Sequence, residues 1–158
     1  MKVTYFHGLE SKQGGPKVAF LETLFDQVFA PKMDYRENPN LFDEELEASQ
    51  GSSLIIGSSM GGWFGYLVAT HTGCPTLLFN PAVHSRSIAL DIEPGKQAAN
   101  HWVILGEQDT VINPLETRAW ITANGVGEFT FESYDGGHRV PLDIFQEHSR
   151  MSITPTAR

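Results

Sequence analysis

The feature of this sequence that most constrains its fold is a glycine-flanked serine at the junction of a buried strand and a helix. The apolar run Leu54-Ile55-Ile56 ends at Gly57-Ser58-Ser59-Met60-Gly61, and an apolar, helix-compatible segment from Trp63 to Ala69 follows at once. A strand that turns into a helix within about one turn strains the backbone of the central serine and lifts its hydroxyl clear of the sheet. Glycine flanks the serine because a side chain there would collide with a neighbouring strand or helix. The pattern G-x-S-x-G in this setting makes Ser59 the candidate nucleophile.

Two plainer interpretations of this turn stand beside that one. A Gly/Ser-rich turn is common by chance, and a strand-to-helix loop can also bind phosphate. The phosphate interpretation is weaker, because neither G-x-G-x-x-G nor G-x-x-x-x-G-K-[ST] is present. Ser58 is the weaker nucleophile, since Ile56 occupies the place where its preceding glycine should stand.

Size and charge narrow the class of protein. The 158 residues predict a single domain over residues 1–150, followed by a disordered tail at 151–158. A formal net charge of −8 argues against nucleic acid or an anionic membrane as an obligatory partner. The first residues do not form a signal peptide, and no apolar run reaches the length of a membrane span, so we expect no membrane insertion.

The chain has one cysteine, Cys74, which excludes an internal disulfide framework. Its place between Gly73 and Pro75 suits a small packed side chain better than a reactive thiol. A reducing, cytoplasmic location is the expectation that follows.

Short apolar runs alternate with amphipathic segments along the rest of the chain, which predicts a parallel sheet covered by helices on both faces. We predict strands at 3–6, 32–35, 54–56, 76–79, 102–105 and 128–134, the last at a sheet edge. We predict helices from Pro16 to the residues before Pro31, over 38–48, 60–71, 114–124 and 141–150, with a loop and one short helix near 85–90 between strands four and five. Ligands in such folds bind beyond the carboxyl ends of the strands, where the loops with candidate functional residues fall.

A serine hydroxyl is a poor nucleophile near pH 7, so it needs a base, and the base needs a group that orients it. Asp109 lies on the turn after the strand at 102–105, and His138 follows the last strand in a Gly-Gly turn. The order Ser59, Asp109, His138 is the one this architecture requires. The competing acids are Asp135, Asp91 and Asp143. Asp135 is too close in sequence to His138 to brace it easily.

The oxyanion of a tetrahedral intermediate needs two donors. Met60 supplies one backbone N–H, at the start of the helix after the nucleophile. The loop after the first strand, His7-Gly8-Leu9, supplies the second through the N–H of Leu9. His7 itself is expected to brace this loop rather than to act as a base, because it lies on the oxyanion side.

With these segments in view, the chain resembles an α/β-hydrolase, and more narrowly the small YqiA-type bacterial esterases. The residues that carry the resemblance are His7-Gly8, Gly57-Ser58-Ser59-Met60-Gly61-Gly62, Asn80-Pro81-Ala82-Val83, Gly106-Glu107-Gln108-Asp109 and Gly136-Gly137-His138. The resemblance implies a three-layer fold with about six parallel strands in the order 2-1-3-4-5-6, with no metal or organic cofactor. It also implies esterase activity on acyl esters through Ser59, Asp109 and His138. The lid region, about 83–100, is very short, which implies an open site.

The leading hypothesis is therefore a serine hydrolase that cleaves small carboxylic esters, with thioesters next, through an acyl-enzyme. A small-molecule acyl ester is the expected partner. Amide or carbon–carbon hydrolysis on the same scaffold stays open, since fold alone does not assign function. The alternative from another class is a catalytically silent hydrolase-like module that binds a ligand or a protein. Its signature would be a missing triad residue, and all three are present in the sequence.

Overall fold

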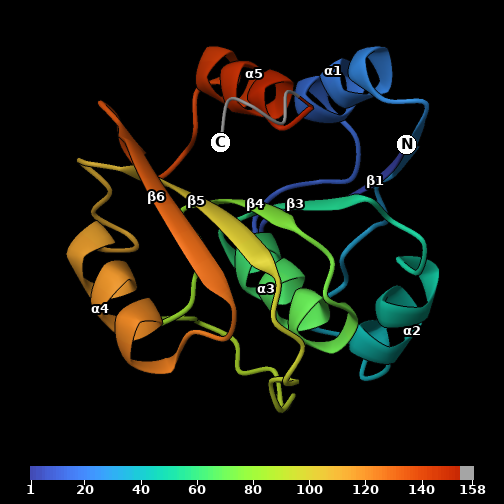
Figure 1. The fold of residues 1–158 in the computed structure, drawn as a ribbon, viewed down its shortest axis with the longest axis horizontal. Helices are drawn as coiled ribbons and strands as arrows, with labels where there is room; N and C mark the ends of the chain where they lie inside the picture. The colour runs from blue at the N-terminus through green and yellow to red at the C-terminus, as the bar shows by residue number, and fades with distance from the viewer. Residues whose placement is uncertain (154–158) are drawn as a thin grey trace.

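A computed structural model describes residues 1–153, in which six strands and five helices alternate except that β5 follows β4 directly (Figure 1). The strands are β1 (Lys2–Phe6), β2 (Gln27–Phe29), β3 (Leu54–Ser58), β4 (Thr76–Phe79), β5 (Asn100–Gly106) and β6 (Glu128–Tyr134). The helices are α1 (Pro16–Leu24), α2 (Leu41–Ala48), α3 (Met60–Thr72), α4 (Pro114–Asn124) and α5 (Leu142–Met151). None of the helices in this described part of the chain is both long and apolar enough to cross a bilayer.

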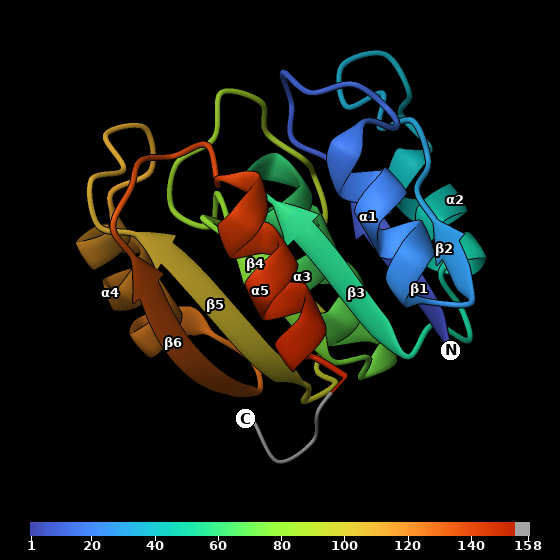
Figure 2. The ribbon, with the colours of Figure 1, turned by 90° about the horizontal axis from the view of Figure 1, so that it is seen from above.

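The strands form one fully parallel sheet in the order β2-β1-β3-β4-β5-β6, which confirms the predicted fold class and strand order. Val3 pairs with Leu54 and Phe6 with Gly57, so β1 and β3 are neighbours in the sheet although α1, β2 and α2 lie between them in the chain. The direction of strand addition reverses at this pair, and such a switch point leaves a crevice at the carboxyl ends. Figure 2 shows the loops that follow the strands gathered at that end.

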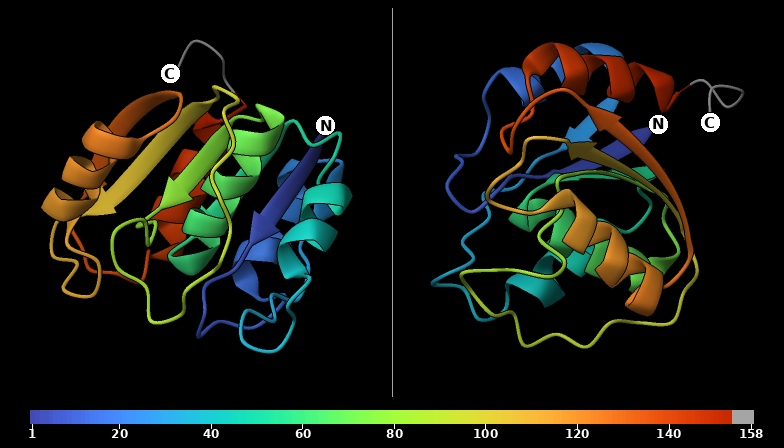
Figure 3. Two further views of the ribbon diagram at one scale, coloured as in Figure 1. Left: turned by 90° about the horizontal axis from the view of Figure 1, so that it is seen from below. Right: turned by 90° about the vertical axis from the view of Figure 1, so that its left-hand side faces the viewer.

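The sheet is the middle of three layers. Helices α1 and α5 lie side by side on one face, and α2, α3 and α4 cover the other (Figure 3). Alternate residues of the central strands point to the two faces: Ile55 and Leu78 pack with Phe64 of α3, whereas Ile56 and Leu77 pack with the α1 and α5 side. A sheet buried on both faces explains why the central strands are continuous apolar runs rather than alternating ones.

The second strand differs from the prediction. It occupies Gln27–Phe29 instead of 32–35, because α1 ends at Leu24 and the chain extends at once from Phe25. Met33 and Tyr35 are buried while Lys32 and Arg36 are exposed, and this alternation is the pattern that a half-buried strand shows. Their polar groups instead bond to the loop after β1, where the Met33 N–H and the Tyr35 hydroxyl both reach His7. The predicted strand at 32–35 was therefore wrong, although its alternating burial is real.

The predicted short helix near 85–90 was also wrong: the described chain is irregular between β4 and β5. Ile88, Leu90 and Ile92 are each partly buried against the α3 side, at a spacing of two that suits extended chain. The carbonyls of Ala82 and Val83 accept hydrogen bonds from the Arg86 side chain rather than from a helical backbone.

The predicted start of α4 is confirmed. The Asn113 side chain accepts hydrogen bonds from the N–H groups of Leu115 and Glu116, at 2.8 and 3.3 Å, and Pro114 is the first helical residue. Of the predicted tail, Met151 ends α5, and residues 154–158 lie outside the described residues.

Candidate active site

Ser59 lies at a sharp turn between β3 and α3. Its backbone has φ 56° and ψ −115°, in the left-handed half of the map that a residue with a side chain rarely adopts. The two flanking glycines make the turn possible. A Cβ on Gly57 would lie 2.2 Å from the Gly61 carbonyl oxygen, and a Cβ on Gly61 would lie 1.9 Å from the Phe6 carbonyl oxygen. A side chain at either position would therefore collide as predicted, and glycine allows β1, β3 and α3 to approach closely around the serine.

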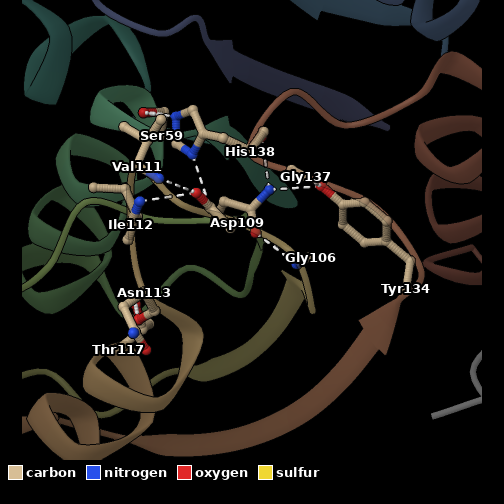
Figure 4. A network of polar contacts seen from close by, with 11 residues as sticks. Ser59, Gly106, Asp109, Val111, Ile112, Asn113, Thr117, Tyr134, Gly137 and His138 are labelled. Atoms are coloured by element: carbon tan, nitrogen blue, oxygen red, sulfur yellow. Dashed lines mark hydrogen bonds and ion pairs between the residues drawn. The ribbon is translucent and has the colours of Figure 1, made fainter.

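A chain of hydrogen bonds runs from this serine to a buried carboxylate (Figure 4). The Ser59 Oγ is 2.9 Å from Nε2 of His138, and Nδ1 of the same ring is 2.8 Å from Oδ2 of Asp109. A carboxylate can only accept, so Nδ1 carries a proton and Nε2 is free to accept the serine hydroxyl proton. The structure thus brings together Ser59, Asp109 and His138 from the ends of three separate strands.

Asp109 is held by the turn that follows β5. Its Oδ1 accepts the backbone N–H groups of Val111 and Ile112, at 2.9 and 2.8 Å, and its side chain is fully shielded from solvent. Oδ2 is left for His138, so each carboxylate oxygen has its own partners. The competing acids Asp91, Asp135 and Asp143 are exposed.

Asn80, at the end of β4, braces the same site, and the sequence analysis did not identify this role. Its Oδ1 accepts the Gly106 N–H (2.7 Å), while its Nδ2 donates to the Tyr134 hydroxyl (2.7 Å) and to the His138 carbonyl (2.8 Å). The Tyr134 hydroxyl in turn donates to the Gly137 carbonyl. Asn80 has φ 44°, a conformation that asparagine tolerates better than most residues. One side chain thus ties β4 and β5 to the loop that carries His138.

The loop after β1 lies beside Ser59: a Cβ on Gly8 would be only 3.6 Å from the Ser59 Cβ. The Met33 N–H donates to Nε2 of His7, so Nδ1 of His7 carries the proton and donates to the Gly8 carbonyl at 2.7 Å. Carbonyl and N–H point in opposite directions across a trans peptide. The N–H of Leu9 therefore points away from the buried His7 ring, and Leu9 lines the cleft over Ser59.

Met60 is the first residue of α3 and lines the same cleft. Within residues 1–153, the backbone N–H groups of Leu9 and Met60 donate no hydrogen bond to the protein. Two unused donors at one cleft, one of them at the positive end of a helix, suit a developing oxyanion. His7 stands in the bracing position that the sequence analysis expected.

The cleft beside Ser59 has a volume of about 470 Å³. Apolar side chains line much of it: Leu9, Met60, Phe79, Ala82, Val111, Ile112 and Val140. Burial, and the nearby charge of Arg139, lower the pKa of Lys17 in the cleft to about 8. A pocket that is mainly apolar with a few convergent polar groups is typical of a site for a small organic ligand.

The structure gives little support to thiol or metal chemistry in the described part of the chain. Burial raises the pKa of the Cys74 thiol to about 11, and its Sγ donates to the Ser52 and Pro75 carbonyls, so it is a packed side chain. No group of three or more His, Cys, Asp or Glu side chains that could hold a metal ion occurs in the described part of the chain.

Comparisons with known proteins agree with this architecture. The model of the uncharacterised protein family UPF0227 matches residues 2–91, which include the first strand, the nucleophile turn and Asn80. A search of curated proteins finds no match.

Several solved structures share the fold. A member of the alpha/beta superfamily of hydrolases from Xanthomonas campestris pv. campestris is 20% identical, with a TM-score of 0.69 over 92% of each chain. The fluorophosphonate-binding serine hydrolase FphF from Staphylococcus aureus is 16% identical, with a TM-score of 0.70 over 99% of this chain and 83% of that one. A monoacylglycerol lipase from Paleococcus ferrophilus is 13% identical, with a TM-score of 0.67 over 99% and 93%. At these identities the likeness establishes the α/β-hydrolase fold.

Proposed function

The chain belongs to the uncharacterised protein family UPF0227 and has the α/β-hydrolase fold, and on that premise we propose that it is a serine hydrolase of small carboxylic esters. The observation that carries the proposal is the unbroken hydrogen-bond chain from Ser59 Oγ through His138 to Asp109. A serine held at a strained turn, with a base on its hydroxyl and a buried carboxylate behind the base, is the arrangement that activates serine.

Acylation begins when Ser59 Oγ attacks the ester carbonyl carbon and its proton passes to Nε2 of His138. Asp109 holds the imidazole in the required tautomer and stabilises its positive charge, without taking the proton itself. The new bond joins Oγ to the acyl carbon, and the bond to the alcohol oxygen breaks as His138 returns the proton to the leaving alkoxide. The result is an acyl-enzyme and a free alcohol.

Deacylation repeats these steps with water. His138 removes a proton from a water molecule, which attacks the acyl carbon and releases the carboxylic acid while Ser59 Oγ recovers its proton. In both halves the N–H groups of Leu9 and Met60 stabilise the oxyanion of the tetrahedral intermediate. Each such donor contributes on the order of 100- to 1000-fold in rate.

Several features support the finer points of this proposal. The cleft is small and mainly apolar at Ser59, which fits a short acyl chain, and no lid helix covers it within the described chain. Thioesters are the next candidates, since their carbonyl reacts through the same intermediate. The single cysteine, buried at Cys74, suits a reducing cytoplasm.

A fluorophosphonate probe tests the proposal without knowledge of the natural substrate. We expect the purified protein to acquire one covalent adduct, located at Ser59 by peptide mass spectrometry, and the Ser59→Ala variant to acquire none. Turnover of a p-nitrophenyl butyrate ester should fall by about 10⁵- to 10⁶-fold in the same variant. A folded wild-type protein that neither reacts with the probe nor cleaves the ester would refute the proposal in favour of a binding module.

A further inference from the structure

The cleft at Ser59 carries a charge opposite to that of the whole chain. Three basic side chains line it, those of Lys17, Arg86 and Arg139, against one acidic side chain, that of Glu10. The chain as a whole has a formal charge of −8. The Glu10 carboxylate is 3.1 Å from the guanidinium of Arg36, which is not part of the cleft lining. The lining of the cleft therefore combines apolar side chains with a basic patch, formed by Lys17, Arg86 and Arg139, on an acidic protein.

Lys17 and Arg139 form the unneutralised part of this patch. They lie close enough for the Arg139 charge to act on the Lys17 ammonium, which also lies 5.5 Å from the centroid of the Phe145 ring. Within residues 1–153 neither side chain has a carboxylate partner. Lys17 is the second residue of α1, so the positive end of that helix adds to the same field. Two adjacent cations without a counter-ion are unfavourable in the free protein, and a bound anion relieves this repulsion.

Arg86 has a different role. Its guanidinium donates to the carbonyls of Ala82 and Val83, at 3.0 and 2.7 Å, and stacks 4.2 Å from the centroid of the Trp63 ring. These contacts tie the irregular segment after β4 to α3. The basic pair available to a ligand is therefore Lys17 and Arg139.

The position of this pair relates it to one part of an ester. Arg139 directly follows His138, the residue that protonates the departing alcohol, and Lys17, Arg139 and Val140 all line the same cleft. The carbonyl oxygen of the ester would face Leu9 and Met60. The alcohol portion, which leaves toward His138, is then the portion that lies nearest the basic pair.

We propose that the substrates are esters whose alcohol portion carries a carboxylate or phosphate group, bound in the cleft by Lys17 and Arg139. This inference rests on the serine hydrolase function proposed above. The anionic group takes no part in bond making: Ser59 Oγ bonds to the acyl carbon, the bond to the alcohol oxygen breaks, and His138 supplies the proton to that oxygen. The charged alcohol then departs.

Binding to the Ser59→Ala variant tests the site separately from turnover. Four esters are titrated by NMR: 4-(butyryloxy)butanoate, 2-(butyryloxy)ethyl phosphate, the neutral 2-methoxyethyl butyrate, and monobutyl glutarate, in which the carboxylate is on the acyl side. We expect at least one of the first two to bind about 10-fold or more tightly than the neutral ester, since a hydrogen bond to a charged group is worth about that factor. The first two arms distinguish carboxylate from phosphate.

Substitutions then locate the anion. Lys17→Gln combined with Arg139→Gln should abolish the preference for the anionic alcohol, whereas Arg118→Gln should not. Arg118 stacks over Phe131, away from the cleft, and its substitution removes one positive charge, as each of the two cleft substitutions does. A neutral ester that binds as tightly as both anionic-alcohol esters, or a preference confined to monobutyl glutarate, would overturn the inference without any variant.

The two proposals fail in different ways. Cleavage of the neutral ester by the wild-type protein, without a preference for either anionic ester, would support the hydrolase proposal and refute the anion site. The opposite outcome is a wild-type protein that cleaves no ester, while Ser59→Ala binds the anionic esters selectively and Lys17→Gln with Arg139→Gln abolishes that selectivity. This outcome would support the anion site and refute the hydrolase proposal.

Discussion

At the scale of single residues, the site assigns a separate task to each oxygen and nitrogen of its polar side chains. One oxygen of Asp109 holds the turn after β5 and the other holds His138. Nδ1 of His138 donates to Asp109, which orients the ring, and Nε2 is left to accept from Ser59. A side chain whose hydrogen-bond partners are all assigned cannot rotate without breaking a bond, so Ser59, His138 and Asp109 are held in the arrangement that the proposed mechanism requires.

Substitution of the carboxylates tests the predicted acid. Asp109→Asn should lower kcat for p-nitrophenyl butyrate by about 10⁴-fold, because an amide at this position can hold His138 in the wrong tautomer. Asp135→Asn is the matched control, since Asp135 is exposed and lies in the same loop as His138. Near-full activity in Asp109→Asn together with loss in Asp135→Asn would contradict the assignment.

The ionisation of Lys17 predicts a pH dependence for anion binding. Its pKa in the folded protein, about 8, means that it is charged below that pH and becomes neutral above it. The affinity of Ser59→Ala for 4-(butyryloxy)butanoate should therefore fall as the pH rises through about 8. The affinity for neutral 2-methoxyethyl butyrate should not change over that range. When Lys17→Gln is added to Ser59→Ala, the difference in affinity between the two esters should no longer depend on pH. A pH dependence that persists would show that another group causes it.

At the scale of elements, the loops at the carboxyl end of the sheet are joined by side chains rather than by further secondary structure. Asn80 links the end of β4 to Gly106 of β5 and to the His138 loop. The buried His7 ring links the loop after β1 to Met33. The positions of His138 and of the loop after β1 therefore depend on two polar side chains that do not line the cleft.

Replacement of Asn80 should reveal this dependence. Asn80→Ala leaves the Gly106 N–H without its acceptor and places alanine in a left-handed conformation, at a cost of about 2–4 kcal/mol in the free energy of unfolding. Urea unfolding measures this change, and kcat should fall as the His138 loop loosens. Asn124→Ala, which removes an exposed bond to the Trp120 carbonyl on α4, is the matched control and should change stability by less than about 1 kcal/mol. Equal effects of the two substitutions would show that Asn80 braces nothing.

Local sequence determines the turn at Ser59 and the positions of Asp109 and His138 after β5 and β6, so these features could be predicted from it. The turn at Ser59 could be predicted because a Cβ on either flanking glycine would collide with residues next to the turn or on the adjoining strand. The order of Ser59, Asp109 and His138 could be predicted because each residue comes soon after a predicted strand. The role of Asn80 was not predicted, because its partner Tyr134 is 54 residues away and only the folded sheet brings them together. The second strand was misplaced for a related reason: Met33 and Tyr35 alternate in burial because they contact His7, not because they pair in the sheet.

At the scale of the whole molecule, stability depends on two apolar layers joined through the sheet, with some polar groups buried inside them. His101 of β5 is one of these. Burial lowers the pKa of its imidazole to about 4. Nε2 donates to the Val126 carbonyl at 3.1 Å, so in the neutral ring Nδ1 accepts a hydrogen bond from the Thr76 hydroxyl at 2.8 Å. The ring also stacks on Phe129, with centroids 4.6 Å apart.

This histidine predicts a loss of stability in weak acid. Its folded pKa is below the unfolded value of about 6.5, so the unfolded chain binds the proton more readily and stability falls as the pH drops from 6.5 toward 4. Between pH 7 and pH 5 this contribution amounts to about 2 kcal/mol. Urea unfolding at the two pH values measures it, and His101→Gln should lose less stability over that interval than the wild type. An identical pH dependence in both proteins would assign the effect elsewhere.

The irregular segment between β4 and β5 has a consequence for how this scaffold can be modified. Residues 84–98 lead from the end of β4 back to the start of β5, and most of their side chains are exposed. At the beginning of this segment, Ser85, Arg86 and Ser87 line the cleft. Lengthening a surface connection costs little free energy, because the entropy of closing a loop grows only slowly with its length. A cap domain grafted at this point would cover the reacting serine without altering any strand of the sheet. A single insertion in this connection is therefore a route to selectivity for bulkier molecules on an otherwise unchanged fold.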